Sequence, residues 1–336
     1  MKQMNTNPGQ KPVLEEMDLH FSQRYPYGSK CELSCDTIKM LCQVWLEERH
    51  GNVKKSTYAG YYYCLKRHIL PHFGVLPLCA LNGENILAFI DKMQQKGLAE
   101  TTVHSVIVVF KAVLKYGIQT HQIGREVLVY CSVNFRRAES KVLTLQDSDR
   151  MKEYLLEQNT VFAIAILLCR GTGIRIGELC GLKWEDINFS TKTIMIKRTI
   201  SRIPNPNQSE GEPKTVLYIR TPKSHTSIRE IPIPQYLIAP LQAMKREKNK
   251  YLLTEKETCT EPRNVQKKFK TILKHCEMQD CNFHAMRHGF ATACLEKGID
   301  CKTVSSILGH ASTRTTMDFY VHTSLRQKQD CINAIT

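Results

Sequence analysis

The sequence predicts two domains, a small all-α domain and a larger one that is mainly α with a small antiparallel β-sheet, an α+β fold. Apolar residues recur at helical spacing throughout 37–125. Between 193 and 233 the pattern changes to alternating β-branched residues, which favour strands, and helical spacing then returns. The length of 336 residues also favours about two domains.

Residues 1–36 mix proline, glycine and polar residues without periodicity, so we interpret them as a lead-in or arm. Four helices are expected to follow. The first should begin behind an N-cap at Asp36, and Pro71 should end the second because proline disfavours helix in the residue before it. The expected ranges of the second, third and fourth helices are Lys54–Lys66, Glu84–Lys96 and Thr101–Tyr116.

A second domain is expected over 144–336. Thr144 and Asp147 have the spacing of a capping box at the start of a helix. Val161–Cys169 is apolar on every side, which predicts a helix in the centre of the core. Two glycines should end that helix, just before another helix begins near Arg175.

Strands are predicted next, and helices should resume at Pro234. A long polar connection, 203–214, separates the first strand from the second, and Lys223 lies in a short turn between the second and the third. The predicted strands are Thr193–Thr199, Thr215–Thr221 and Ile228–Ile233.

The excess of positive charge predicts a polyanionic partner. The formal net charge is +15, from 47 basic and 32 acidic residues. Both folded segments share it: 13 basic and 6 acidic residues give +7 over 37–138, and 30 and 21 give +9 over 139–336. Two basic domains favour nucleic acid as the partner. The segment 126–143 is interpreted as a basic linker, whose expected DNA contacts are Arg136, Arg137 and Lys141.

The 14 cysteines are scattered and no pair has CxxC spacing, a pattern typical of reduced thiols in a cytoplasmic protein. The polar N-terminus lacks a signal peptide, which agrees with that compartment. One group could be interpreted as metal ligands, but zinc sites use tighter paired spacings, so neither metal nor cofactor is expected. That group is His275, Cys276, Cys281 and His284. The longest apolar run, Val161–Cys169, falls short of the ~20 residues of a membrane span.

Polar motifs in the second domain suit the cleavage of a phosphodiester. Such a reaction needs a nucleophile, cations on the non-bridging oxygens and an acid for the leaving oxygen. Arginine suits the cation role because its planar fork binds phosphate bidentately, and lysine can act as the acid because nearby cations lower its pKa. The motifs in chain order are Thr172–Leu179 (TGIRIGEL), His284–Arg287 (HAMR), Leu308–His310 (LGH) and Tyr320–His322 (YVH).

Taken together, these motifs resemble the pattern of the tyrosine recombinases, or phage integrase family. TGIRIGEL resembles the family's first-arginine box, TPKSHTSIREIPI its β-hairpin lysine region, and HAMRHGFAT its second box. The gaps of 23 residues from Arg287 to His310 and of 10 from His310 to Tyr320 are similar to those of the family. The resemblance implies six catalytic residues: Arg175, Lys223, His284, Arg287, His310 and Tyr320.

The resemblance also implies the reaction, a strand cleavage and rejoining like that of type IB topoisomerases. Tyr320 would attack the phosphate and form a 3′-phosphotyrosine, while Lys223 would protonate the 5′ leaving oxygen. A 5′-hydroxyl from the partner duplex would then rejoin the strands without ATP.

The remaining roles concern the phosphate. Arg175 and Arg287 would bind it, and His284 and His310 would contact it and handle the tyrosine's proton. Glu178 lies one helical turn after Arg175 and is expected to orient it.

The family's architecture implies a helical, SAM-like core-binding domain over 37–125 that clamps double-stranded DNA, and a catalytic domain over 144–336. It implies a free monomer that forms a tetramer on paired sites, with Val321–Thr336 as a possible strap onto a neighbour. An excisionase or host accessory factor is a further expected partner.

The subtype leaves alternatives open. We favour the integrase of a bacterial mobile element, because the connection 203–214 resembles β-hairpin extensions of such enzymes. The alternatives are a housekeeping recombinase that resolves chromosome dimers, a nicking and closing enzyme that resembles a topoisomerase, and a catalytically inactive DNA-binding protein. The residues specify neither the target site, nor the preference for integration or excision, nor the type of element.

Overall fold

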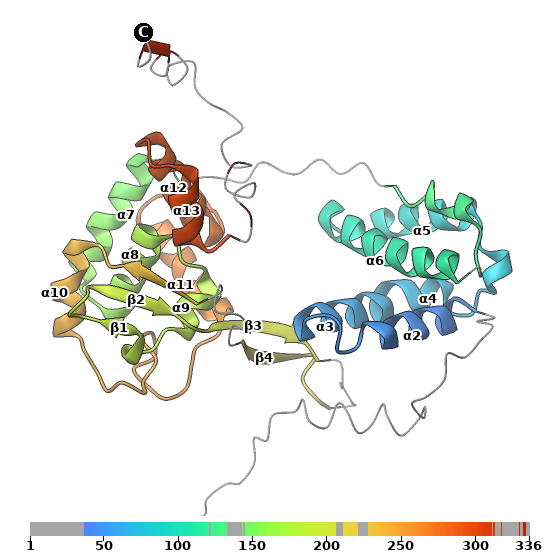
Figure 1. The fold of residues 1–336 in the computed structure, drawn as a ribbon, viewed down its shortest axis with the longest axis horizontal. Helices are drawn as coiled ribbons and strands as arrows, with labels where there is room; N and C mark the ends of the chain where they lie inside the picture. Colours follow the sequence, from blue (N-terminus) through green and yellow to red (C-terminus); the bar gives the residue numbers. More distant parts are fainter. Residues whose placement is uncertain are drawn as a thin grey trace, which may run out of the picture. The chain divides into compact units, whose positions relative to one another are not determined.

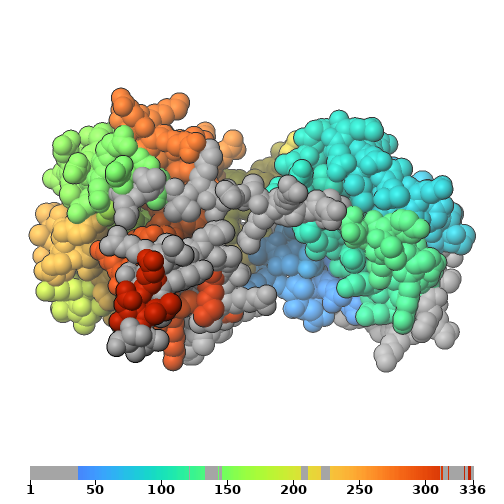
Figure 2. Space-filling view, turned by 90° about the horizontal axis from the view of Figure 1, so that it is seen from above, coloured from blue at the N-terminus to red at the C-terminus, as the bar shows by residue number. Residues whose placement is uncertain are grey.

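The computed structural model describes residues 37–120, 122–132, 143, 145–205, 211–220 and 228–310, with isolated positions at 312, 317, 329, 332 and 333. The chain divides into two compact units (Figure 1). The helices of the first unit are coloured blue to green in the space-filling view, and the described residues from 145 onward run from green to red (Figure 2). The units comprise Met1–Arg137 with Ile203–Val216, and Ala138–Arg202 with Leu217–Thr336.

The first unit is built from helices, as the sequence predicts. Its aromatic core contains Trp45, Phe73 and Phe110, all fully buried, and the rings of Phe73 and Phe110 stack with their centroids 4.8 Å apart. Its elements are α2 (Ile38–Arg49), α3 (Lys55–Cys64), the π-helix η1 (Leu65–Ile69), α4 (Leu70–Phe73), η2 (Leu78–Ala80), α5 (Gly83–Gln95), α6 (Glu100–Gln119) and η3 (Arg125–Leu128).

Two boundary predictions in this unit are wrong. The N-cap of α2 is Thr37 and not Asp36, because the Thr37 hydroxyl accepts the N–H of Met40 at 3.4 Å. Pro71 does not end the helical path either. A π-turn after α3 resets the hydrogen-bond register, so that Pro71 falls in the first turn of α4, where a missing N–H costs nothing.

Helix α6 is 20 residues long and apolar enough to cross a membrane by length and composition. A single helix of this kind is weak evidence, since core helices pass the same test. Its buried stripe, which includes Val103, Ile107 and Leu114, packs against α2, α3 and α5. We therefore interpret α6 as the core helix of this unit.

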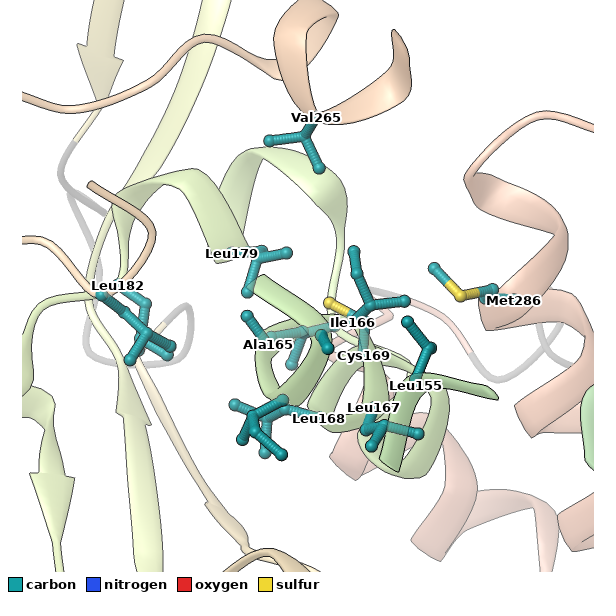
Figure 3. Close-up of a cluster of buried hydrophobic side chains, with 14 of the residues drawn as sticks. Leu155, Ala165, Ile166, Leu167, Leu168, Cys169, Leu179, Leu182, Val265 and Met286 are labelled. Atoms are coloured by element: carbon teal, nitrogen blue, oxygen red, sulfur yellow. The ribbon is translucent and has the colours of Figure 1, made fainter. Parts of the chain in front are cut away.

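The second unit surrounds helix α8, whose residues Ala163–Cys169 are all buried. Figure 3 shows Ile166 and Leu167 of this helix among Leu179, Val265 and Met286 from other elements. The elements from 145 onward are α7 (Leu145–Gln158), α8 (Val161–Thr172), α9 (Ile176–Gly181), η4 (Trp184–Asp186), β1 (Ile187–Asn188), β2 (Thr193–Ile196), β3 (Thr199–Pro204), β4 (Thr215–Arg220), β5 (Arg229–Pro232), α10 (Gln235–Ala243), α11 (Pro262–His275), α12 (His284–Glu296) and α13 (Cys301–Leu308).

The strands form two small antiparallel sheets. One has the order β1-β2-β5, and Ile194 lies opposite Ile231 in its register. The other is the hairpin β3-β4. The predicted strand Thr193–Thr199 is therefore divided between the two sheets, and the two-residue β1 was too short to predict from its residues. The predicted N-cap Thr144 lies outside the described residues.

Helix α8 offers a test of the core. Leu167→Ala should lower the free energy of unfolding by about 2–5 kcal/mol, because Leu167 is 0% exposed and its loss leaves a cavity. Leu156→Ala on α7 is the matched control, since Leu156 is 39% exposed and its loss should cost far less. Urea unfolding measures both, and equal losses would contradict this description of the core.

Candidate active site

The site begins at the turn after α8. Gly173 ends this helix with φ of 65°, a left-handed conformation that glycine adopts without strain. A Cβ there would lie 2.5 Å from the side chain of Leu308 and 2.7 Å from that of Phe290, so close packing also requires glycine. Gly171, expected to help end the helix, lies within it. The turn places Arg175 at the N-terminus of α9.

Arg175 is fixed by the next turn of its own chain and by α13. Its backbone N–H donates to Glu178 Oε2 at 2.9 Å, and its Nη1 donates to Glu178 Oε1 at 2.9 Å, which is the expected contact. Its guanidinium also donates to the carbonyls of Leu308 at 3.3 Å and Gly309 at 3.2 Å. The side chain is still 38% exposed, so part of the fork faces solvent.

Arg287, on the first turn of α12, connects the ends of two other helices. It is 4% exposed and donates from Nη1 to the carbonyl of Gly173 at 2.9 Å and from Nη2 to that of Leu308 at 2.8 Å. Burial and the neighbouring charges of Arg175 and Arg229 together lower the pKa of Arg287 to about 9, against the opposing effect of Glu178. The guanidinium is therefore charged at neutral pH.

Arg229, at the start of β5, was not predicted as a site residue. Its Nη1 and Nη2 donate to both oxygens of Glu178 at 3.0 and 2.7 Å, and its Nε donates to the carbonyl of Ile307 at 2.8 Å. Burial opposes ionisation of Glu178, but the bonds from Arg229 and the charge of Arg175 prevail and lower its pKa. The carboxylate is thus ionised and lies between two arginines.

The C-terminal end of α13 receives these arginines. The carbonyls of Ile307, Leu308 and Gly309 together accept from Arg229, Arg175 and Arg287. Such carbonyls lack helical partners and carry partial negative charge, so cations stabilise them. Gly309 ends the helix with φ of 63°, and the next residue, His310, donates its backbone N–H to the carbonyl of Ser305 at 3.1 Å. The predicted histidine therefore lies beside the arginines.

Both predicted histidines are neutral at pH 7. Burial lowers the pKa of His310 to about 4, helped by the charges of Arg287, Arg175, His284 and Arg229. Burial also lowers the pKa of His284, with further effects from Arg287 and Arg175. Neutral imidazoles next to guanidinium groups can accept a proton from a hydroxyl while the arginines hold an anion.

The structure brings together Arg175, His284, Arg287 and His310, which come from three separate motifs. The other predicted site residues lie outside the described part of the chain: Lys223, Tyr320, Arg136, Arg137 and Lys141. Lys214, the last residue of the connection before β4, is exposed. Within the described ranges, no three His, Cys, Asp or Glu side chains could hold a metal ion.

The fold and the site define a class of enzyme that acts on phosphodiesters, and comparison with known proteins identifies the family. The chain belongs to the phage integrase family, whose model matches residues 141–326, and the model of the family's N-terminal SAM-like domain matches 37–94. It is a tyrosine recombinase, an enzyme that breaks and rejoins DNA. The predicted fold class, a mainly helical chain with small antiparallel sheets, is confirmed.

Relatives include Xer-type recombinases and mobile-element integrases. The chain is 28% identical over 274 residues to "Tyrosine recombinase XerC-like" from Caldanaerobacter subterraneus subsp. tengcongensis. This match covers 74% of this chain and 69% of the relative. The chain's fold is similar to that of the Tn1549 transposon integrase in complex with a circular intermediate DNA, with a TM-score of 0.72, 20% identity, and coverage of 88% of this chain and 99% of that one. The fold is also similar to that of a lambda integrase tetramer bound to a Holliday junction, with a TM-score of 0.64 and 16% identity. This match covers 95% of this chain and 89% of the lambda integrase chain.

The lowered histidine pKa values predict how stability depends on pH. An unfolded histidine has a pKa near 6.5, whereas burial lowers that of folded His310 to about 4. Between these two pH values the unfolded chain therefore binds a proton at this residue and the folded chain does not. The stabilisation is complete above pH 6.5 and is lost as the pH falls towards 4. His310→Asn should therefore weaken the pH dependence of the free energy of unfolding in this window, as measured by urea unfolding. His50→Asn, at an exposed position of the first unit, is the matched control for the loss of a histidine. An unchanged dependence in His310→Asn would contradict the pKa assignment.

Proposed function

We propose that this recombinase integrates and excises a bacterial mobile element, cutting duplex DNA through a 3′-phosphotyrosine on Tyr320. One observation carries the chemistry: Arg175 and Arg287 meet at the end of α13 beside two histidines that are neutral at pH 7. Among the described side chains, three arginines against one glutamate leave a surplus of two positive charges, which suits a phosphodiester anion.

The proposed cleavage step distributes its protons and charge over these groups. The Tyr320 oxygen forms a bond to phosphorus as the bond from phosphorus to the 5′ oxygen breaks. The tyrosine's proton passes to a neutral imidazole, His310 or His284, and Lys223 gives a proton to the departing oxygen. Arg175 and Arg287 stabilise the negative charge that builds on the non-bridging oxygens, where preorganised donors are most effective. The reverse sequence with a new 5′-hydroxyl rejoins the strands.

The mobile-element subtype has two supports. The transposon integrase shares its fold over 88% of this chain, and the hairpin β3-β4 continues the ladder to an Asn205–Lys214 backbone bond of 2.9 Å. Such an extended hairpin resembles those of mobile-element integrases. Because the chain is also similar to the XerC-like recombinase, the resolution of chromosome dimers is the second candidate function. DNA that flanks the coding sequence distinguishes the two, because an integrated element carries an attachment site or an excisionase reading frame nearby.

The proposed partner is double-stranded DNA in the cytoplasm, contacted by Arg136, Arg137 and Lys141 of the linker and by the helical domain. The domain limits proposed from the sequence are 37–125 and 144–336. The free protein would be a monomer that forms a tetramer on paired sites, an assembly that the lambda integrase structure contains on a Holliday junction. An excisionase or host factor would set the direction, and no cofactor is proposed.

Tyr320→Phe tests the nucleophile. The probes are nicked duplexes tiled across the DNA that flanks the coding sequence, together with a pool of randomised core sequence. A nick near the cleaved bond lets the short 5′-hydroxyl fragment leave, so the covalent complex accumulates. We expect wild-type protein to form adducts that resist detergent, and Tyr320→Phe to form none while binding the same duplexes almost equally. Tyr236→Phe on α10 is the control and should capture DNA as the wild type does. An adduct in Tyr320→Phe would show that another residue attacks.

Lys223→Ala tests the general acid. A 5′-bridging phosphorothiolate replaces the leaving oxygen with sulfur, and a thiolate leaves without protonation. Lys223→Ala should cleave the ordinary captured duplex slowly, by about 10²-fold or more, and should regain most of its rate on the sulfur substrate. Lys214→Ala is the matched control, at an exposed lysine of the same hairpin region. Rescue of Lys214→Ala in place of Lys223→Ala would move the assignment to Lys214.

A further inference from the structure

Arg229 holds two helices of the site to the sheet. Its strand β5 pairs with β2 through Ile231 and Ile194, so its backbone is anchored in the sheet. From there its fork reaches Glu178 on α9, and its Nε reaches the carbonyl of Ile307 at the end of α13. The side chain is 12% exposed, so Arg229 is placed to act on other residues of the site and not on a bound strand.

The geometry of these contacts requires arginine. Two donors in one plane bind the two carboxylate oxygens, and a third donor of the same rigid group binds the carbonyl. A lysine keeps the charge but presents a single flexible ammonium group. The packing is close as well, because a Cβ added at Gly309 would lie 2.9 Å from Arg229 Nη1.

Loss of Arg229 would disturb the residues that hold the phosphate. Glu178 also accepts from Arg175, so a carboxylate without its second partner is free to rotate and carry Arg175 with it. The end of α13 would lose the bond at Ile307, two residues before the Gly309 carbonyl that Arg175 contacts and three before His310.

We propose that Arg229 is a positioning residue for strand cleavage, which fixes Glu178 and the end of α13 so that Arg175 and His310 keep their reactive arrangement. This inference rests on the proposed recombination chemistry. The interaction is separate from the six residues that the motifs assign, and it acts through them.

Arg198 provides a matched control within the same unit. Its Nε donates to the carbonyl of Gly181 at 3.1 Å, its Nη1 donates to Glu185 at 3.0 Å, and its Nη2 pairs with Asp186. Its side chain is 15% exposed, close to the 12% of Arg229, and these three hydrogen bonds reach no residue of α13. Arg198→Met therefore removes the same number of donor groups from a place outside the site.

The test compares Arg229→Met, Arg229→Lys and Arg198→Met on the nicked duplex that the wild type captures best. Affinity for this duplex and the rate of covalent capture with protein in excess are measured separately. Arg229→Met should slow covalent capture by about 10²-fold, because a shift of about 1 Å in a catalytic group can cost that much. Its affinity for the duplex should change by less than about threefold. Arg229→Lys should recover only part of the rate, and Arg198→Met should capture within about threefold of wild type.

A double-mutant cycle shows whether Arg229 acts through Glu178. If it does, the variant with both Glu178→Gln and Arg229→Met should capture DNA faster than the product of the two single effects predicts, because the two changes disturb one shared interaction. Effects that multiply would overturn the inference, and so would a capture rate in Arg229→Met equal to that in Arg198→Met. If Arg229→Met does not fold by circular dichroism, Arg229→Lys decides, and a wild-type rate in that variant overturns the proposal. Absence of any wild-type adduct would instead refute the proposed function.

Discussion

The site depends on the Glu178 carboxylate. Among the described residues, Arg175, Arg229 and Arg287 converge at the end of α13, where their like charges repel one another. Burial and these neighbouring charges lower the pKa of Arg287. Glu178 pairs with Arg175 and Arg229, and the carbonyls of α13 take further donors from all three. The carboxylate remains ionised because these partners outweigh its own burial. A charge network of this kind is stable only when every member has a hydrogen-bond partner. The three arginines share their acceptors, so the loss of one arginine disturbs the bonds of the other two.

Burial and the charges of the same network together explain why both histidines are neutral. Positive charges close to His310 and His284 favour neutral imidazoles, and burial acts in the same direction. The site can thus hold an anion with its arginines and accept a proton with its histidines at one pH. Its members come from α9, β5, α12 and α13, so only the assembled second unit contains it. The left-handed glycines at the ends of α8 and α13 let these elements approach one another.

Sequence reasoning identified the residues whose chemistry and order are distinctive. Arg175, His284, Arg287 and His310 lie together in the structure, and each could be selected from the sequence because it belongs to a motif with its own local signature. Arg229 lay within the quoted lysine region and was missed, since its role depends on Glu178, which is 51 residues away in sequence. Pro71 was misjudged for a similar reason: the π-turn that accommodates it depends on packing around η1 and not on a local residue preference. The division of Thr193–Thr199 between two sheets likewise depends on the partners β5 and β4.

The most direct test is a crystal structure of Tyr320→Phe bound to its captured duplex, with the scissile phosphate intact. The two non-bridging oxygens should accept from Arg175 and Arg287, with His310 within hydrogen-bonding distance and with Glu178 still held by both Arg175 and Arg229. A phosphate bound away from the two arginines, or a Glu178 released from Arg229 in the complex, would contradict it.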